Sequence, residues 1–168
     1  MNKPEFVYVT YIATSPEKLW EALISSEFTR QYWDGRTIHS DWKVGSPVKL
    51  LNADGAVDWI GEIIQANPPH LLSYTFDPQR FLRSQGISEP PSRVTFEISG
   101  LGSEKSPVRI GNHQGYSKRD GVRLQVTHDN FEPDSKVAGA AAQGWPTILS
   151  SLKSLLESGR SLELVWEC

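Results

Sequence analysis

Residues 144–159 read Gly144-Trp145-Pro146-Thr147-Ile148-Leu149-Ser150-Ser151-Leu152-Lys153-Ser154-Leu155-Leu156-Glu157-Ser158-Gly159. Large apolar side chains recur at positions 145, 148, 149, 152, 155 and 156, which is the spacing of one apolar face on an α-helix. Serine, lysine and glutamate fill most of the positions between them, and Gly159 stands where a C-cap glycine belongs. Because most of the preceding sequence favours strands, this amphipathic helix predicts a sheet that wraps around it.

The start of this helix has two interpretations. The small residues at 138–142 lead into Trp145, which favours a helix that begins near Asp134 or Ser135. Such a helix would be kinked at Pro146, because proline removes one backbone hydrogen bond and clashes with the preceding turn. Alternatively, Pro146 opens the helix and residues 136–144 form a loop. We favour the longer, kinked helix.

Upstream of this helix the chain alternates between strand-like runs and turns. Ser15-Pro16 predicts the start of a first short helix, and a second is expected over 27–33 with Ser26 as its cap. Strands are expected over 6–12, 47–51, 57–65, 71–76, 93–99 and 121–128. Residues 77–92 and 100–120 are interpreted as loops, the second either mobile or carrying an added short hairpin. Turn-linked strands of this kind predict an antiparallel sheet.

Length and composition narrow the class of protein. A chain of 168 residues favours one domain, expected over 1–168. A net charge of −3, from 17 basic and 20 acidic residues, does not favour a nucleic-acid partner. The single Cys168 provides no disulfide framework, and we find neither a signal peptide nor an apolar run that could span a membrane. We therefore expect a soluble cytoplasmic protein with no membrane partner.

Five segments resemble the activator of Hsp90 ATPase homologue 1-like family, within the START-like, Bet v 1-like (SRPBCC) superfamily. In the family's order they are 15–23, 32–36, 41–46, 67–76 and 144–159. The resemblance implies an α+β helix-grip fold, in which a curved antiparallel sheet of about six or seven strands wraps around a long C-terminal helix. Two short helices follow the first strand, and an elongated apolar cavity lies under the long helix. Members of the superfamily bind lipids, hormones or polyketides, and some cyclise polyketides.

Aromatic side chains form the candidate site, because apolar ligand sites are lined in this way with a few polar groups. For any single residue, ordinary core packing is the simpler explanation. His128 lies in register with Val122, Leu124 and Val126, where it could bind a ligand or transfer protons. The favoured alternative is a strand-end histidine bonded to backbone or water. The full set of expected ligand-binding residues is Trp33, Trp42, Trp59, Tyr74, Phe76, Phe96, His128, Trp145 and Leu149.

The function we expect is binding of a small, mainly apolar or aromatic molecule, similar to a lipid or polyketide, with residues 77–92 as a lid. One alternative is a protein-interaction module, related to Hsp90 co-chaperones or forming a homodimer. The other is a cyclase- or hydrolase-type enzyme that uses His128 or Tyr74 in the same cavity, although we find no catalytic motif. No cofactor is expected, and no metal, since His39 and Asp41 provide too few ligands.

Overall fold

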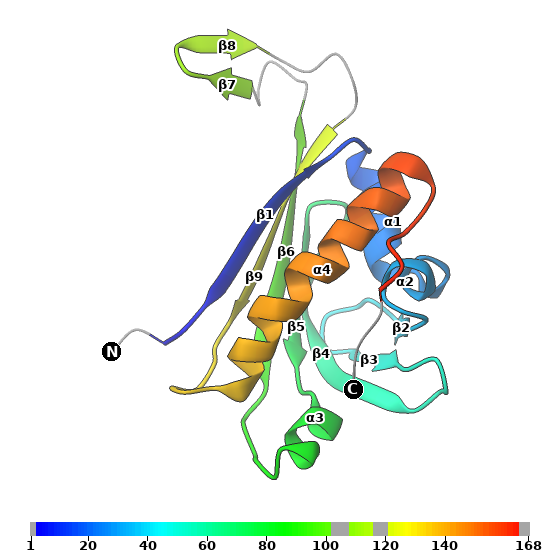
Figure 1. Ribbon diagram of the computed structural model, residues 1–168, viewed down its shortest axis with the longest axis vertical. Coiled ribbons are helices and arrows are strands. Elements are labelled where there is room, and N and C mark those ends of the chain that lie inside the picture. Colours follow the sequence, from blue (N-terminus) through cyan, green and yellow to red (C-terminus); the bar gives the residue numbers. More distant parts are fainter. Residues whose placement is uncertain (1–2, 102–107, 116–120, 165–168) are drawn as a thin grey trace.

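Figure 1 shows the computed structural model, which describes residues 3–101, 108–115 and 121–164. A seven-stranded antiparallel sheet curves around one long helix, α4 (Lys136–Ser158), and its strand order is β1-β9-β6-β5-β4-β3-β2. The α+β helix-grip fold expected from the sequence is therefore confirmed. The strands are β1 (Phe6–Ile12), β2 (Thr37–Ser40), β3 (Pro47–Leu51), β4 (Val57–Asn67), β5 (Leu71–Phe76), β6 (Ser92–Leu101) and β9 (Gly121–Asp129).

Two short helices, α1 (Pro16–Ile24) and α2 (Ser26–Tyr32), lie between β1 and β2 as expected. The Ser15 hydroxyl accepts a hydrogen bond from the Lys18 backbone N–H at 3.2 Å, which is the predicted N-cap. The prediction that Ser26 caps the second helix is wrong. Ser26 is the first residue of α2, and its hydroxyl instead donates to the carbonyl of Ile38 at 2.6 Å, tying α2 to β2.

Helix α4 begins at residue 136 and continues through Pro146 to residue 158, so the alternative in which residues 136–144 form a loop is wrong. The Ser135 hydroxyl accepts from the Ala138 N–H at 3.0 Å and caps the first turn. At the other end Gly159 adopts φ +78°, a left-handed conformation that glycine tolerates best, and its N–H donates to the Leu155 carbonyl. Both ends of the helix are therefore fixed by local sequence.

The core lies between the sheet and α4. Alternate residues of β6 and β9 face inward, as their sequence pattern predicts, and they pack with Leu149 and Leu152 of α4. Next to β5, strand β4 comes unusually close at Gly61, where an added Cβ would lie 1.8 Å from the carbonyl oxygen of Thr75. Only glycine permits this approach. Gly61 lies two residues from Trp59 in β4, so this close approach helps to set the position of the Trp59 side chain.

The segment predicted as a loop over 77–92 contains a helix, α3 (Gln79–Ser84). Its Leu82 packs with Phe131 and Val137 in a second, smaller hydrophobic cluster. The carboxylate of Glu89, after α3, accepts hydrogen bonds from the Ser135 hydroxyl at 2.6 Å and the Lys136 N–H at 2.8 Å. These contacts hold the α3 segment against the start of α4.

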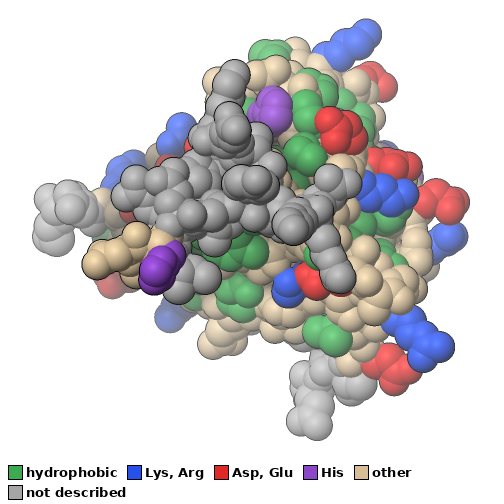
Figure 2. All heavy atoms as spheres, turned by 90° about the horizontal axis from the view of Figure 1, so that it is seen from above, with side chains coloured by type: hydrophobic (Ala, Val, Ile, Leu, Met, Phe, Trp, Pro, Cys, Tyr) green, Lys and Arg blue, Asp and Glu red, His purple; other side chains and the backbone are tan. Residues whose placement is uncertain are grey.

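Within the predicted 100–120 loop, the short strands β7 (Val108–Ile110) and β8 (His113–Gly115) pair as an antiparallel hairpin. The rest of that predicted loop lies largely outside the described residues. Figure 2 views the molecule from this end and shows acidic and basic side chains interspersed around the rim. The charged side chains that can be seen there among the described residues are therefore of both signs.

Candidate functional site

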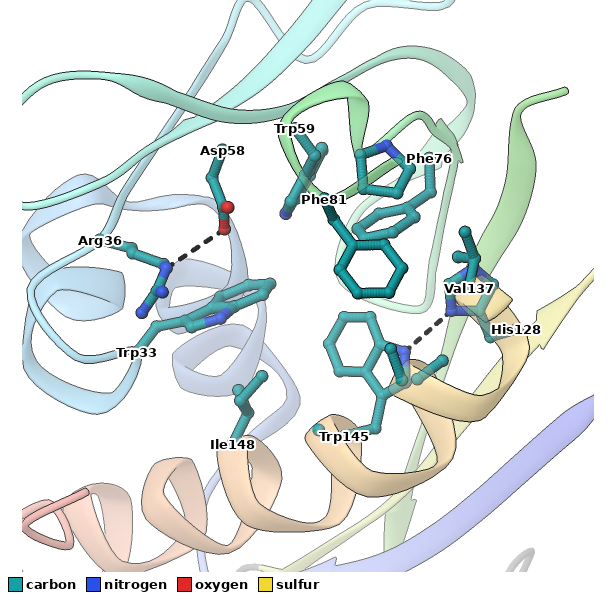
Figure 3. Close-up of a pocket in the computed structure, with 14 residues that line it drawn as sticks. Trp33, Arg36, Asp58, Trp59, Phe76, Phe81, His128, Val137, Trp145 and Ile148 are labelled. Carbon is teal, nitrogen blue, oxygen red and sulfur yellow. Dashed lines mark hydrogen bonds and ion pairs between the residues drawn. The ribbon is translucent and has the colours of Figure 1, made fainter. Parts of the chain in front are cut away.

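A pocket of about 370 Å³ lies between α4, α3 and the adjoining ends of β4 and β5. Figure 3 shows aromatic rings from the end of α2 and from β4, β5, α3 and α4 converging on it. Its volume falls within the range typical of small-molecule sites, roughly 300–1,000 Å³. The lining residues are Trp33, Arg36, Asp58, Trp59, Phe76, Pro78, Phe81, His128, Val137, Ala140, Ala141, Gly144, Trp145 and Ile148.

The pocket exists because one face of α4 changes from large to small side chains. Towards the C-terminal half of the helix, this face carries large residues such as Leu149 and Leu152, which are fully buried against the sheet. Towards the N-terminal half it carries Ala140, Ala141 and Gly144, all of which line the pocket. Small side chains leave the space between helix and sheet unfilled, so the sequence of α4 determines where the cavity lies.

Aromatic rings form the remaining walls. Trp33, at the end of α2, lies 5.5 Å from the Trp145 ring and 6.3 Å from the Trp59 ring, measured between centroids. Phe76, at the end of β5, lies 5.1 Å from Trp59, and Phe81 of α3 also lines the pocket. Rings held by contact with one another present a rigid apolar surface to any molecule that enters.

His128 takes part in a buried hydrogen-bond network at the sheet side of the pocket. Its side chain is 0% exposed. The Trp145 indole N–H donates to His128 Nδ1 at 3.0 Å, and His128 Nε2 lies 2.8 Å from the Ser92 hydroxyl oxygen. An indole nitrogen can only donate, so Nδ1 is unprotonated and Nε2–H donates to Ser92. The Ser92 hydroxyl then donates to the Phe76 carbonyl at 3.3 Å. Each donor in this hydrogen-bond network, from Trp145 through His128 to Ser92, therefore has an acceptor.

Burial keeps His128 neutral. Burial lowers the pKa of His128 to about 3, and the nearby Asp129 carboxylate opposes that shift only in part. With both ring nitrogens engaged, the imidazole meets the pocket as a neutral ring. Burial also raises the pKa of Tyr74 well above its ordinary value. Neither group is therefore suited to proton transfer near neutral pH.

The indole N–H of Trp59 is a buried donor without a hydrogen-bond partner among the described residues. Trp59 is 2% exposed, and its Nε1 has no hydrogen-bond partner among the described residues. In Figure 3 the nitrogen lies at the end of the ring that points toward Trp33 and the interior of the pocket. An unpaired buried donor costs about 1–3 kcal/mol, so this N–H is a hydrogen-bond donor that the protein leaves unsatisfied inside the pocket.

An ion pair borders the opposite side of the pocket. Arg36 Nε donates to Asp58 Oδ2 at 3.2 Å, and Arg36 Nη1 donates to Asp34 Oδ2 at 3.4 Å. Both Arg36 and Asp58 also line a neighbouring, more polar hollow of about 560 Å³. Two carboxylates thus accompany one guanidinium at this rim, so the rim carries no surplus positive charge to attract an anion.

The nine residues expected from the sequence fall into three groups. Five line the pocket: Trp33, Trp59, Phe76, His128 and Trp145. Tyr74, Phe96 and Leu149 are buried behind the walls, where Tyr74 stacks on Trp59 at 5.2 Å and Phe96 meets Trp145 edge-on at 5.7 Å. Trp42 lies elsewhere, because its backbone turns with φ +58° before β3 and places the ring in a separate surface hollow.

Sequence reasoning missed the ion pair and the small-residue wall. Nothing in the local pattern links Arg36 with Asp58, which are 22 positions apart. The small residues did have a signal, because Ala140, Ala141 and Gly144 have the spacing of one helical face. Among the described residues, no three histidine, cysteine or acidic side chains gather as a metal site requires. No helix within the described residues is both long enough and apolar enough to cross a bilayer.

The family model described as Activator of Hsp90 ATPase homolog 1-like protein matches residues 13–114, more than half of the chain. A protein from Mesorhizobium loti has 23% identity and a TM-score of 0.67, over 91% of this chain and 96% of that one. The Aha1 dimer from Colwellia psychrerythraea has 18% identity and a TM-score of 0.65, over 94% and 99%. An HSP90 activator from Plasmodium falciparum has 21% identity and a TM-score of 0.64, over 90% and 95%. Comparison with curated proteins gives no match.

Proposed function

This chain belongs to the Activator of Hsp90 ATPase homolog 1-like family, and from that premise we propose that it binds a small, mainly apolar molecule in the pocket under α4. The single observation that carries the proposal is the pocket itself, an aromatic-walled space that the small residues of α4 leave open. A core that served packing alone would be expected to fill such a space, since protein interiors are close-packed.

The expected affinity follows from the area that a ligand buries. Apolar burial contributes roughly 25 cal/mol per Å², so a two-ring aromatic molecule that buries about 250 Å² gains about 6 kcal/mol. Ordering costs reduce this gain, while contacts with preformed aromatic walls add to it. We therefore expect dissociation constants between about 1 mM and 1 μM for simple aromatic probes.

The pocket supports binding better than catalysis. The enzyme alternative relied on His128 or Tyr74 for acid–base work. Both nitrogens of His128 are engaged in hydrogen bonds, and burial shifts the pKa of each residue away from neutrality. A carrier or sensor of an apolar molecule needs neither group to titrate.

Fluorescence titration with N-phenyl-1-naphthylamine, a neutral aromatic probe that brightens in apolar surroundings, tests this function. Gly144→Leu places a large side chain in the pocket. Gly139→Leu is the matched control, since Gly139 lies on the same helix outside the pocket and has nothing within 4 Å of an added Cβ. Both changes replace a helical glycine and favour the helix similarly, by about 0.8 kcal/mol.

We expect wild type and Gly139→Leu to bind the probe with similar affinity, and Gly144→Leu to lose at least tenfold. No saturable binding by the wild type would contradict the proposed function. Equal binding by both variants would do the same, because the probe would then be bound outside the pocket.

Self-association through β1 is a second candidate function. This strand ends the sheet, so one of its edges pairs with no strand in the described parts of the chain. Val7, Val9 and Tyr11 form an apolar stripe on it and are 46%, 37% and 54% exposed. The related Aha1 from Colwellia psychrerythraea is described as a dimer. An unpaired apolar edge strand favours pairing with a second copy.

Light scattering during size-exclusion chromatography tests this candidate. We expect a dimer for the wild type and for Val44→Lys, a change at an exposed site away from β1, but a monomer for Val9→Lys. A wild type that stays monomeric at high concentration rejects the candidate, as does a Val9→Lys variant that still dimerises.

A further inference from the structure

We propose that the ligand of this pocket is uncharged and carries a hydrogen-bond acceptor, such as a ketone or ether oxygen, that accepts from the indole N–H of Trp59. This inference rests on the proposed function and specifies the chemistry of the molecule bound. The observation that points to it is the buried Nε1 of Trp59, which lines the pocket and has no partner among the described residues.

The surroundings of Trp59 fix the orientation of its N–H. The indole stacks on Tyr74 at 5.2 Å with planes 18° apart, and Phe76 lies against it at 5.1 Å. A ring packed in this way cannot rotate toward another hydrogen-bond acceptor without losing those contacts. Its N–H therefore stays directed into the pocket and becomes satisfied only by what occupies it.

Trp145, another of the three indoles that line the pocket, provides an internal contrast. Trp145 also lines the pocket and is 4% exposed, yet its N–H is bonded to His128 at 3.0 Å. Of these two indoles, only Trp59 has a donor left for a ligand. Since a free buried donor costs about 1–3 kcal/mol, a ligand oxygen that relieves this cost is selected over a hydrocarbon of the same shape.

The charges around the pocket argue for a neutral acceptor. Arg36 is the one cationic residue among those that line the pocket, and it is already paired with Asp58 and Asp34. A carboxylate bound at Trp59 would lose its hydration in return for one neutral N–H, which does not offset the cost of burying a charge. A carbonyl or ether oxygen loses far less water.

Three probes that differ only at one carbon test this inference: fluorene, 9-fluorenone and fluorene-9-carboxylate. Their affinities are measured by competition against N-phenyl-1-naphthylamine in the wild type, in Trp59→Phe and in Trp42→Phe. The ketone is better hydrated than the hydrocarbon, so the ratio of their two affinities is compared between proteins. Trp42→Phe is the control because it shortens an indole outside the pocket.

We expect the preference for 9-fluorenone over fluorene to fall about tenfold in Trp59→Phe and to keep its wild-type value in Trp42→Phe. We also expect fluorene-9-carboxylate to bind most weakly to the wild type. A spectrum of ¹⁵N-labelled wild type gives a second readout that does not depend on any variant folding. In it, the Trp59 indole N–H resonance should move downfield with 9-fluorenone and not with fluorene.

An unchanged preference in Trp59→Phe, together with an unmoved Trp59 resonance, would overturn the inference and leave the proposed function standing. That result would mean that water alone satisfies the N–H. Tightest binding by the carboxylate would overturn the uncharged part. If the wild type bound none of the three probes and no N-phenyl-1-naphthylamine, the proposed function and this inference would fail together.

Discussion

Trp145 Nε1 and His128 Nδ1 are joined by a hydrogen bond of 3.0 Å that links α4 to β9 across the buried interior. Because the indole can only donate, this bond selects the tautomer of His128 that carries its proton on Nε2. It therefore fixes the direction of the whole hydrogen-bond network through Ser92 to the Phe76 carbonyl. This one contact joins α4 to β9 and fixes the tautomer of the histidine beside the pocket.

Stability should fall in acid because His128 is held neutral. Its pKa is about 3 in the folded protein and about 6.5 in an unfolded chain. Between these values the unfolded chain binds a proton that the folded protein does not. The free energy of unfolding should thus decrease by about 1.4 kcal/mol per pH unit as the pH falls from about 6.5 towards 3. At higher pH this contribution is constant.

Urea unfolding of the wild type and of His128→Gln between pH 4 and 7.5 measures this effect. The acidic residues are the same in both proteins. The difference between the two plots of unfolding free energy against pH therefore isolates the contribution of His128. His39→Gln, at an exposed position, is the matched control for replacing a histidine by glutamine. A difference between wild type and His128→Gln that does not vary with pH would show that folding does not lower the pKa of His128.

Trp145→Phe should destabilise the fold more than Trp59→Phe does. Both changes shorten a buried indole in the same pocket. The first leaves the Nδ1 acceptor of His128 unpaired, while the second removes a donor that already lacks a partner among the described residues. We expect a difference of about 1–3 kcal/mol in the free energy of unfolding, measured by urea denaturation at pH 7.5. Equal losses would mean that the Trp145–His128 bond contributes no net stability.

Gly61→Ala should be among the most damaging small substitutions in the sheet. Its Cβ would lie 1.8 Å from the Thr75 carbonyl oxygen, so β4 and β5 would have to separate. We expect a loss of about 2 kcal/mol or more, measured by thermal or urea unfolding. Gly139→Ala, in the open part of α4, should instead raise stability by up to about 1 kcal/mol. Normal stability for Gly61→Ala would refute the close approach of the two strands.

Glu89→Ala should weaken the start of α4. The Glu89 carboxylate accepts from the Ser135 hydroxyl and from the Lys136 N–H, where a negative charge also complements the helix dipole. The expected cost is about 1 kcal/mol. Glu132→Ala, which removes an exposed carboxylate shortly before the start of α4, is the control. Equal effects of the two changes on the melting temperature would show that the charge matters and the hydrogen bonds do not.

The sequence predicted most of the fold because its signals are local. Alternating strands and the helical spacing of residues 145–156 depend on neighbouring residues alone, and both are confirmed. Helix α3 escaped prediction because its six residues show no clear helical pattern. What holds it is Leu82, which packs against Phe131 and Val137 from distant parts of the chain.

The site was less predictable for the same reason. An aromatic residue in the sequence indicates burial, but the backbone conformation determines which cavity its ring faces. The left-handed conformation of Trp42 directs that ring away from the pocket. Whether an indole N–H has a partner is also a tertiary property. Trp59 and Trp145 look alike in the sequence, yet only Trp145 lies within reach of an acceptor on β9.

The most direct test of the central claim is to locate N-phenyl-1-naphthylamine on the isotope-labelled protein by intermolecular nuclear Overhauser effects. The pocket account predicts contacts between the probe and the ring protons of Trp33, Trp59 and Trp145, which surround the cavity. Contacts confined to Val7, Val9 and Tyr11 on β1, or no contacts at saturating probe, would contradict it.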